Sequence, residues 1–153
     1  MSSRDYEEFL ESCGSHEVRY LIVGAHAVAH HARPRSTKDL DLWVEPSKDN
    51  AERLLATIRE FFGTDLGLQV QDLTKPGMIV QLGIAPSRID LLNRISGVPD
   101  FQQAWDRKVE GRYGPVTAFF LSLEDLIQAK KAAGRNRDLH DLESLERARS
   151  RQR

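Results

Sequence analysis

Two aspartates separated by one residue give the clearest chemical signal in this sequence. Asp39 and Asp41 open a segment in which polar and apolar residues alternate as far as Val44. Because successive side chains of a strand point to opposite faces, both carboxylates lie on one face, where they can hold a divalent cation. An isolated pair of this kind also fits an edge-facing strand that turns a polar side to water. The pair alone therefore does not distinguish a metal site from a solvated strand face.

A third aspartate lies in a similar segment further along the chain. The segment 88–93 reads as a strand in which Asp90 points away from its apolar neighbours. Three acids on neighbouring strands repel one another unless a cation neutralises them. Taken alone, Asp90 is a surface residue of a strand or a partner for Arg88. Taken together with Asp39 and Asp41, it is the expected third ligand and general base.

A strand that turns directly into a helix precedes these acids. The apolar segment 18–23 predicts a buried strand, and the alanine-rich segment 25–31 after Gly24 predicts a helix that ends before Pro34. The free N–H groups at the start of such a helix can bind a phosphate, and glycine allows close approach of the ligand. The same connection is also a common structural element. The connection therefore indicates a phosphate site only in combination with the acids.

The remaining elements follow from hydrophobic periodicity and turn residues. Helices are expected at 2–13, 46–62, 101–107, 122–134 and from 138 onward, and strands at 68–71, 78–84 and 116–120. The segments 78–84 and 88–93 should pair as a hairpin, and a glycine-rich turn should precede residue 116. These elements predict an α/β (α+β) fold: a small mixed sheet with helices mainly on one face. We expect a single domain, 1–153, with its core at about 18–120 and C-terminal helices at about 122–150.

Composition excludes several classes of protein. Acids and bases nearly cancel to a net charge of −1, which argues against a nucleic-acid coat or a membrane-surface protein. The single cysteine, Cys13, excludes an internal disulfide, and no apolar run approaches the roughly 20 residues of a membrane span. The first eight residues carry acids where a signal peptide needs a basic stretch. We therefore expect a cytoplasmic protein with no membrane partner.

The combined motifs resemble those of a known family. The segment 23–44, with its glycine and its paired aspartates, resembles the glycine and acidic motifs of bacterial nucleotidyltransferases of the DNA polymerase beta superfamily. It is most similar to the group that includes the abortive-infection toxins. The segment 126–142 also resembles the downstream lysine and aspartate motif of that group, so the resemblance spans about residues 18–146. The chain departs from the pattern at Ala25, where relatives have glycine or serine, and it is shorter than the toxins.

The resemblance implies the nucleotidyltransferase fold and an enzyme that moves a nucleoside monophosphate from a nucleoside triphosphate to a hydroxyl group, releasing pyrophosphate. It implies Mg²⁺, as two ions, or Mn²⁺, held by the catalytic residues Asp39, Asp41 and Asp90. It implies nucleotide contacts by Gly24, Ala25, Arg35, Lys38, Lys130 and Arg135. The acceptor is an RNA, a protein or a small molecule. A toxin role implies an antitoxin protein as partner.

Several alternatives stay open at this level. The chain could be a catalytically weak module that binds a nucleotide or a partner on the same fold; Ala25 and the short length favour this, whereas the intact acid set opposes it. His26 and His30 lie one helical turn apart, as metal ligands or as half-buried histidines. Asp138 and Asp141 share a helix face and could simply pair with a nearby lysine or arginine.

Overall fold

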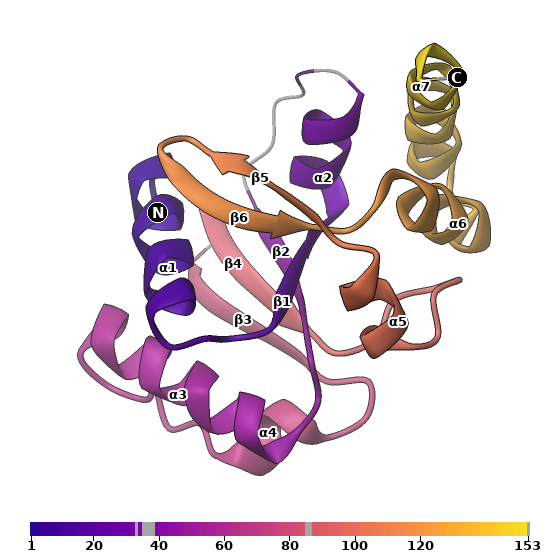
Figure 1. Ribbon diagram of the computed structural model, residues 1–153. Coiled ribbons are helices and arrows are strands. Elements are labelled where there is room, and N and C mark those ends of the chain that lie inside the picture. Colours follow the sequence, from indigo (N-terminus) through magenta and orange to yellow (C-terminus); the bar gives the residue numbers. More distant parts are fainter. Residues whose placement is uncertain (33, 35–38, 85–86, 153) are drawn as a thin grey trace.

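The computed structural model describes residues 1–32, 34, 39–84 and 87–152. One mixed sheet of six strands forms its centre, in the order β3-β4-β2-β1-β6-β5 (Figure 1). The strands are β1 (Tyr20–Val23), β2 (Leu40–Val44), β3 (Ile79–Ile84), β4 (Ser87–Leu92), β5 (Val109–Tyr113) and β6 (Val116–Phe120). The helices are α1 (Ser3–Ser15), α2 (Gly24–His31), α3 (Lys48–Phe62), α4 (Val70–Thr74), α5 (Phe101–Asp106), α6 (Leu123–Ala133) and α7 (Asn136–Arg151). The predicted α/β class with a mixed sheet is confirmed.

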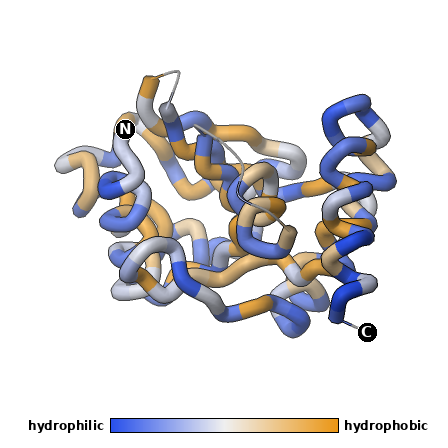
Figure 2. The backbone as a smooth tube through the Cα atoms, turned by 90° about the horizontal axis from the view of Figure 1, so that it is seen from above, coloured by the Kyte–Doolittle hydropathy of each residue, from blue (hydrophilic) through white to orange (hydrophobic). Residues whose placement is uncertain are grey.

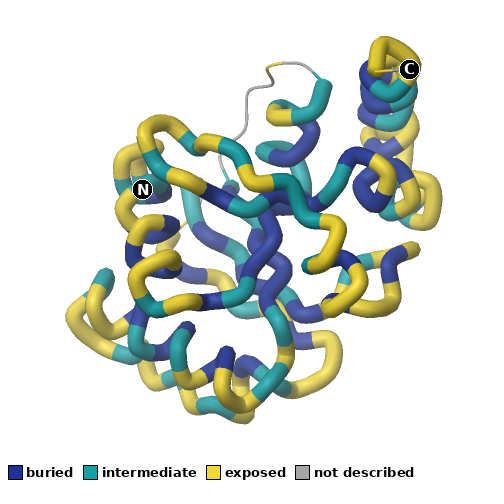
Figure 3. The backbone as a smooth tube through the Cα atoms, viewed as in Figure 1, coloured by how far each residue is buried: buried dark blue, intermediate teal, exposed yellow. Residues whose placement is uncertain are grey.

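The middle of the sheet consists of β4, β2 and β1. The strand β2 runs parallel to β4 and antiparallel to β1, and β1 also pairs with β6 in parallel. The predicted antiparallel hairpin of β3 and β4 is confirmed, although Pro86 of its connection lies outside the described residues. The strands β1 and β2 are largely buried (Figure 3). Acidic residues at the start of β2 therefore lie inside the sheet and not at its edge.

Both faces of β2 are covered along part of its length. Residues that pair across strands share a face, so Tyr20 lies on the same face as its partner Val44. Helix α1 packs on this face, where Cys13 is close enough to influence the pKa of Tyr20, and its Phe9 contacts Phe61 of α3 edge-on. On the other face, the ring of Phe101 in α5 lies 5.1 Å from Trp43. Packing therefore leaves the beginning of β2 as the more accessible end of this second face.

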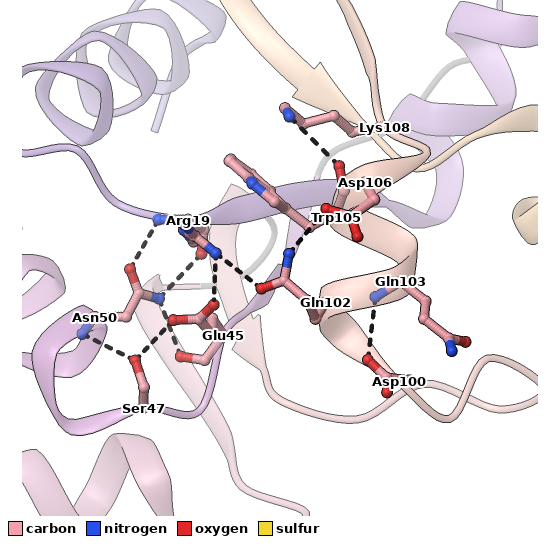
Figure 4. A network of polar contacts seen from close by, with 10 residues as sticks. All are labelled: Arg19, Glu45, Ser47, Asn50, Asp100, Gln102, Gln103, Trp105, Asp106 and Lys108. Carbon is pink, nitrogen blue, oxygen red and sulfur yellow. Dashed lines mark hydrogen bonds and ion pairs between the residues drawn. The ribbon is translucent and has the colours of Figure 1, made fainter.

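A polar network around the buried Asn50 fixes the end of β1 and β2 that lies away from the acids (Figure 4). The Oδ1 atom of Asn50 accepts a hydrogen bond from the N–H of Arg19 at 2.8 Å, and its Nδ2 donates to the carbonyls of Arg19 and Glu45, each at 3.0 Å. The Arg19 guanidinium donates to Glu45 and to Gln102 of α5. Ser47 caps α3 by accepting from the Asn50 N–H, as the sequence predicts. The network thus holds β1, β2, α3 and α5 in one arrangement.

The last two helices form a separate pair beside α2 (Figure 1). Helix α6 begins at the cap Ser122 and ends at Gly134, which adopts a left-handed conformation with φ of 67°. Both boundaries agree with the prediction. Helix α7 is mostly hydrophilic (Figure 2) and continues to Arg151, so the basic C-terminal segment is helical for most of its length.

Two sequence predictions of local structure are wrong. The expected strand at 68–71 is absent: 68–69 are coil and 70–71 begin α4, because the Asp72 carboxylate accepts the N–H of Gln69 at 2.8 Å and caps a short helix there. The expected turn before residue 116 contains the additional strand β5, which pairs with β6. Gly111 of this strand pairs with Ala118, and the His30 ring packs so closely against it that an added Cβ would overlap the ring. A strand with alternating exposed charges at the sheet edge lacks the apolar run that would reveal it.

Candidate active site

The three aspartates singled out from the sequence lie on adjoining strands. Asp41 of β2 and Asp90 of β4 are partners in register across the parallel pair, and Asp39 immediately precedes β2. All three belong to the face opposite Leu40 and Leu42, as the period of two predicts. On the same face, Trp43 is only 2% exposed, so this side of β2 is no solvated surface. The interpretation of the pair as the wet side of an edge strand is therefore wrong.

The glycine turn packs directly on Asp41. Val23, the last residue of β1, is the register partner of Asp41, and Gly24 follows with φ of 69°, a conformation that favours glycine. A Cβ added at Gly24 would overlap the Oδ2 atom of Asp41. The start of α2 carries no side-chain cap from Val23, and this helix start lies beside the Asp41 carboxylate.

Burial and neighbouring charges perturb the carboxyl group of Asp41. Burial raises the pKa of Asp41 to about 6, and repulsion by Asp90 and Asp39 adds to this effect. The positive charges of Lys130 and Arg88 act in the opposite direction. Carboxylates crowded in this way bind cations readily because a cation removes the repulsion. Without a metal, the carboxylates of the site therefore repel one another. All of their potential donor atoms are oxygens.

Arg88 of β4 lies among the carboxylates. Its Nε donates to Asp90 Oδ1 at 2.9 Å, and its Nη2 lies 3.8 Å from Asp39 Oδ2. Arg88 and Asp90 are two positions apart along the strand, so both side chains point to the same face. The sequence suggested the pair with Asp90. The second contact, with Asp39, depends on the parallel pairing of β2 and β4 and could not be predicted.

Oxygen ligands from three carboxylates fit Mg²⁺ or Mn²⁺ by chemistry. In the described part of the chain, however, no three His, Cys, Asp or Glu side chains converge closely enough to hold one ion. The backbone register does bring Asp41 and Asp90 side by side. The residue types and strand positions of the three aspartates therefore fit a cation. Their side chains would have to rotate to converge on one ion.

A pocket of about 210 Å³ opens beside the glycine turn. Its apolar wall comes from the end of β4, the residue after β6 and helix α6, through residues such as Leu92, Leu121 and Leu126. Gly24 and Lys130 also line the pocket, so the turn and the lysine of the predicted nucleotide set meet there. A cavity of this kind suits a flat, partly apolar group with charged groups attached.

Lys130 and Arg135 line the pocket while bound to buried acids. The Nζ of Lys130 lies 3.2 Å from both Asp138 Oδ1 and Asp141 Oδ2, and Arg135 Nε lies 2.6 Å from Asp138 Oδ2. Asp138 is fully buried, and the hydrogen bond from Arg135 is the main reason that its pKa falls to about 2. The prediction that these aspartates pair with a nearby lysine is confirmed. Lys130 is also close enough to Asp41 to lower its pKa.

The other predicted residues are placed as follows. Ala25 is the second residue of α2 and is half-buried beside the turn. Arg35 and Lys38 lie outside the described residues. His26 and His30 do not converge: the His26 ring lies between two tyrosines, whereas the His30 ring stacks on Phe120 at 3.9 Å. The histidine pair is therefore part of the packing of α2.

Sequence reasoning missed two polar residues of the pocket. Arg94 and Ser96 follow β4 and line the same cavity as Lys130. Neither residue belongs to a motif, and both come close to the glycine turn only through the long-range pairing of the strands. No local signal could have identified them.

The mixed sheet, with a glycine turn and carboxylates at the ends of its middle strands, is compatible with a small nucleotidyltransferase-like α+β fold. The chain belongs to the DUF2204 family, described as a nucleotidyl transferase of unknown function, whose family model matches residues 2–153. This match supports nucleotidyl transfer as the general class of activity, with a nucleoside triphosphate as substrate. No curated protein matches the sequence significantly. Among the described residues, no helix combines the length and the apolarity needed to cross a membrane.

Proposed function

We propose that this protein is a metal-dependent nucleotidyltransferase that moves a nucleoside monophosphate from a nucleoside triphosphate to a hydroxyl group of an RNA, a protein or a small molecule. One observation carries the proposal: the backbone of the Gly24 turn lies directly against Asp41, which is in register with Asp90. The start of α2, which is suited to receive a phosphate, therefore lies beside the acids. A purely structural role gives no reason for the burial of Asp41 among like charges.

The position of each residue suggests its role in the proposed reaction. The N–H groups at the start of α2 and the backbone of Gly24 are suited to hold phosphate oxygens. The pocket with Lys130 and Arg94 beside the turn is suited to the nucleoside and its charged groups. Asp90, next to Asp41, is suited to accept the proton of the acceptor hydroxyl or to orient that hydroxyl.

Asp39, Asp41 and Asp90 are the residues that would hold the metal. Mg²⁺, or Mn²⁺ in its place, would neutralise the phosphates and stabilise the charge that develops on the attacking and departing oxygens. Such an ion would relieve the repulsion at Asp41, whose pKa burial and its neighbours raise to about 6. The toxin role and the antitoxin partner stay predictions from the sequence resemblance.

A second candidate is a weakly catalytic binding module on the same fold. The ion pairs of Arg88 with Asp90 and Asp39 favour it, because they engage two of the three acids. Such a module would bind a nucleotide or a partner protein without transferring a nucleotidyl group.

The deciding experiment is label transfer. Purified protein is incubated with Mg²⁺, each α-labelled nucleoside triphosphate in turn, and either total cell RNA or lysate protein. The enzyme should label a defined band, and Asp41→Asn should abolish the label. Asp49→Asn is the matched control, since Asp49 is an exposed carboxylate at the start of α3, beyond the far end of β2. Nucleotide binding by the wild type without any transfer would favour the binding module.

A further inference from the structure

Arg88 has no role in the function proposed above, although it contacts two of the three acids. Its side chain is 27% exposed, and those of Asp90 and Asp39 are 15% and 35% exposed. The guanidinium is thus partly shielded from water and lies on the same face of the sheet as the carboxylates. Strand geometry requires this, because Arg88 and Asp90 are separated by two positions on β4.

The contacts of Arg88 span the two strands that carry the acids. One carboxylate, that of Asp90, belongs to β4, and the other, that of Asp39, immediately precedes β2. The same positive charge also lowers the pKa of Asp41. A single guanidinium therefore interacts with every member of the acid set, as a bound cation would.

The hydrogen bond from Arg88 also bears on the side-chain position of Asp90. The backbone register makes Asp41 and Asp90 neighbours, yet in the described part of the chain no three acidic or histidine side chains converge on one point. The hydrogen bond from Arg88 Nε orients the Asp90 carboxylate toward the arginine. An ion that needs that carboxylate must compete with the guanidinium for it.

We propose that Arg88 is the resident counter-cation of the acid set and that a divalent cation must displace its guanidinium to bind there. This inference rests on the proposed function, because it assumes that the three aspartates are the metal ligands. It assigns Arg88 a role in regulating occupancy: the arginine lowers the affinity for metal alone, so that binding depends on the additional ligands that a triphosphate supplies. Arg88 is then a positioning residue whose removal strengthens metal binding.

The test is the affinity for Mn²⁺ without nucleotide, measured by electron paramagnetic resonance of the free ion, in wild type, Arg88→Ala and Arg88→Lys. Loss of a partly exposed ion pair should tighten Mn²⁺ binding by about fivefold in Arg88→Ala. Arg88→Lys keeps the charge and should stay closer to wild type. Arg112→Ala is the matched control, because Arg112 is an exposed arginine on the edge strand β5. Asp41→Asn identifies the binding as that of the acid set.

Melting temperatures in chelator provide a second measurement. Arg88→Ala should melt below wild type without metal, because the acids lose their counter-cation, and the addition of Mn²⁺ should remove much of this difference. Where Arg88→Ala does not fold, Arg88→Gln keeps a hydrogen-bond donor near Asp90 without the charge and serves the same comparison.

The outcomes separate this proposal from the proposed function. Equal or weaker Mn²⁺ binding by Arg88→Ala, at a site that Asp41→Asn abolishes, would overturn the role of Arg88 and leave the metal site intact. Weaker binding would mean that Arg88 supports the orientation of Asp90. Binding that Asp41→Asn does not affect, or no binding in any variant with or without nucleotide, would overturn both.

Discussion

Replacing Asp41 by asparagine should stabilise the metal-free protein at neutral pH. Burial, followed by repulsion from Asp90 and Asp39, raises the pKa of Asp41 from 3.8 to about 6. Its ionised form is therefore less favourable in the folded protein than in the unfolded chain. A pKa difference of this size corresponds to about 3 kcal/mol. Screening by water at a carboxyl that is partly exposed reduces the expected gain in the free energy of unfolding to about 1–2 kcal/mol.

The pH dependence of this gain has a definite sign. Below about pH 4, Asp41 is protonated in both the folded and the unfolded state, so the variant and wild type should be equally stable. As the pH rises from 3.8 to about 6, the unfolded chain releases the proton first, and wild type loses stability relative to Asp41→Asn. Above that range the difference should be constant.

Thermal unfolding followed by circular dichroism measures both effects. In chelator at pH 7.5 (a value of about one and a half units above the Asp41 pKa), Asp41→Asn should melt about 2–6 °C above wild type. Millimolar Mg²⁺ should raise the melting temperature of wild type by about 2–4 °C, as expected for about 1 kcal/mol of binding free energy, and leave the variant unchanged. Asp49→Asn should respond like wild type. The reasoning is refuted if Asp41→Asn melts below wild type in chelator and both respond equally to Mg²⁺.

The remaining predictions concern the turn and the buried acids. Gly24→Ala should lower the free energy of unfolding by about 1–3 kcal/mol, because φ is positive and the new Cβ overlaps the Asp41 carboxylate; the double variant Gly24→Ala/Asp41→Gly should recover part of the loss in urea titrations. Lys130→Met should cost about 2–3 kcal/mol in the same assay, since it removes a cation from the buried carboxylates of Asp138 and Asp141, and an unchanged midpoint would contradict this. The depressed pKa of Asp138, about 2, predicts stability that is complete above about pH 4 and is lost as the pH falls toward 2; Asp138→Asn should flatten this part of the profile.

The sequence by itself determined several helix ends and the shared face of Asp39 and Asp41. Capping by Ser2, Ser47 and Ser122 and the left-handed Gly134 follow from residue types at helix ends, and the structure confirms each of them. The strand period of two was enough to place both carboxylates of the Asp39–Asp41 segment on one face. These features depend on a few neighbouring residues, so the local sequence contains the information.

Tertiary structure alone decided what surrounds these residues. The parallel pairing of β2 with β4 makes Asp41 a neighbour of Asp90, and it also brings Arg88 to Asp39. The edge strand β5 escaped detection because its stability comes from pairing with β6 and not from its own pattern. The pKa of Asp41 depends on burial and on charges from other strands and from α6. Each of these properties arises between residues far apart in the chain, and pairing and burial across such separations are set by the packing of the whole sheet.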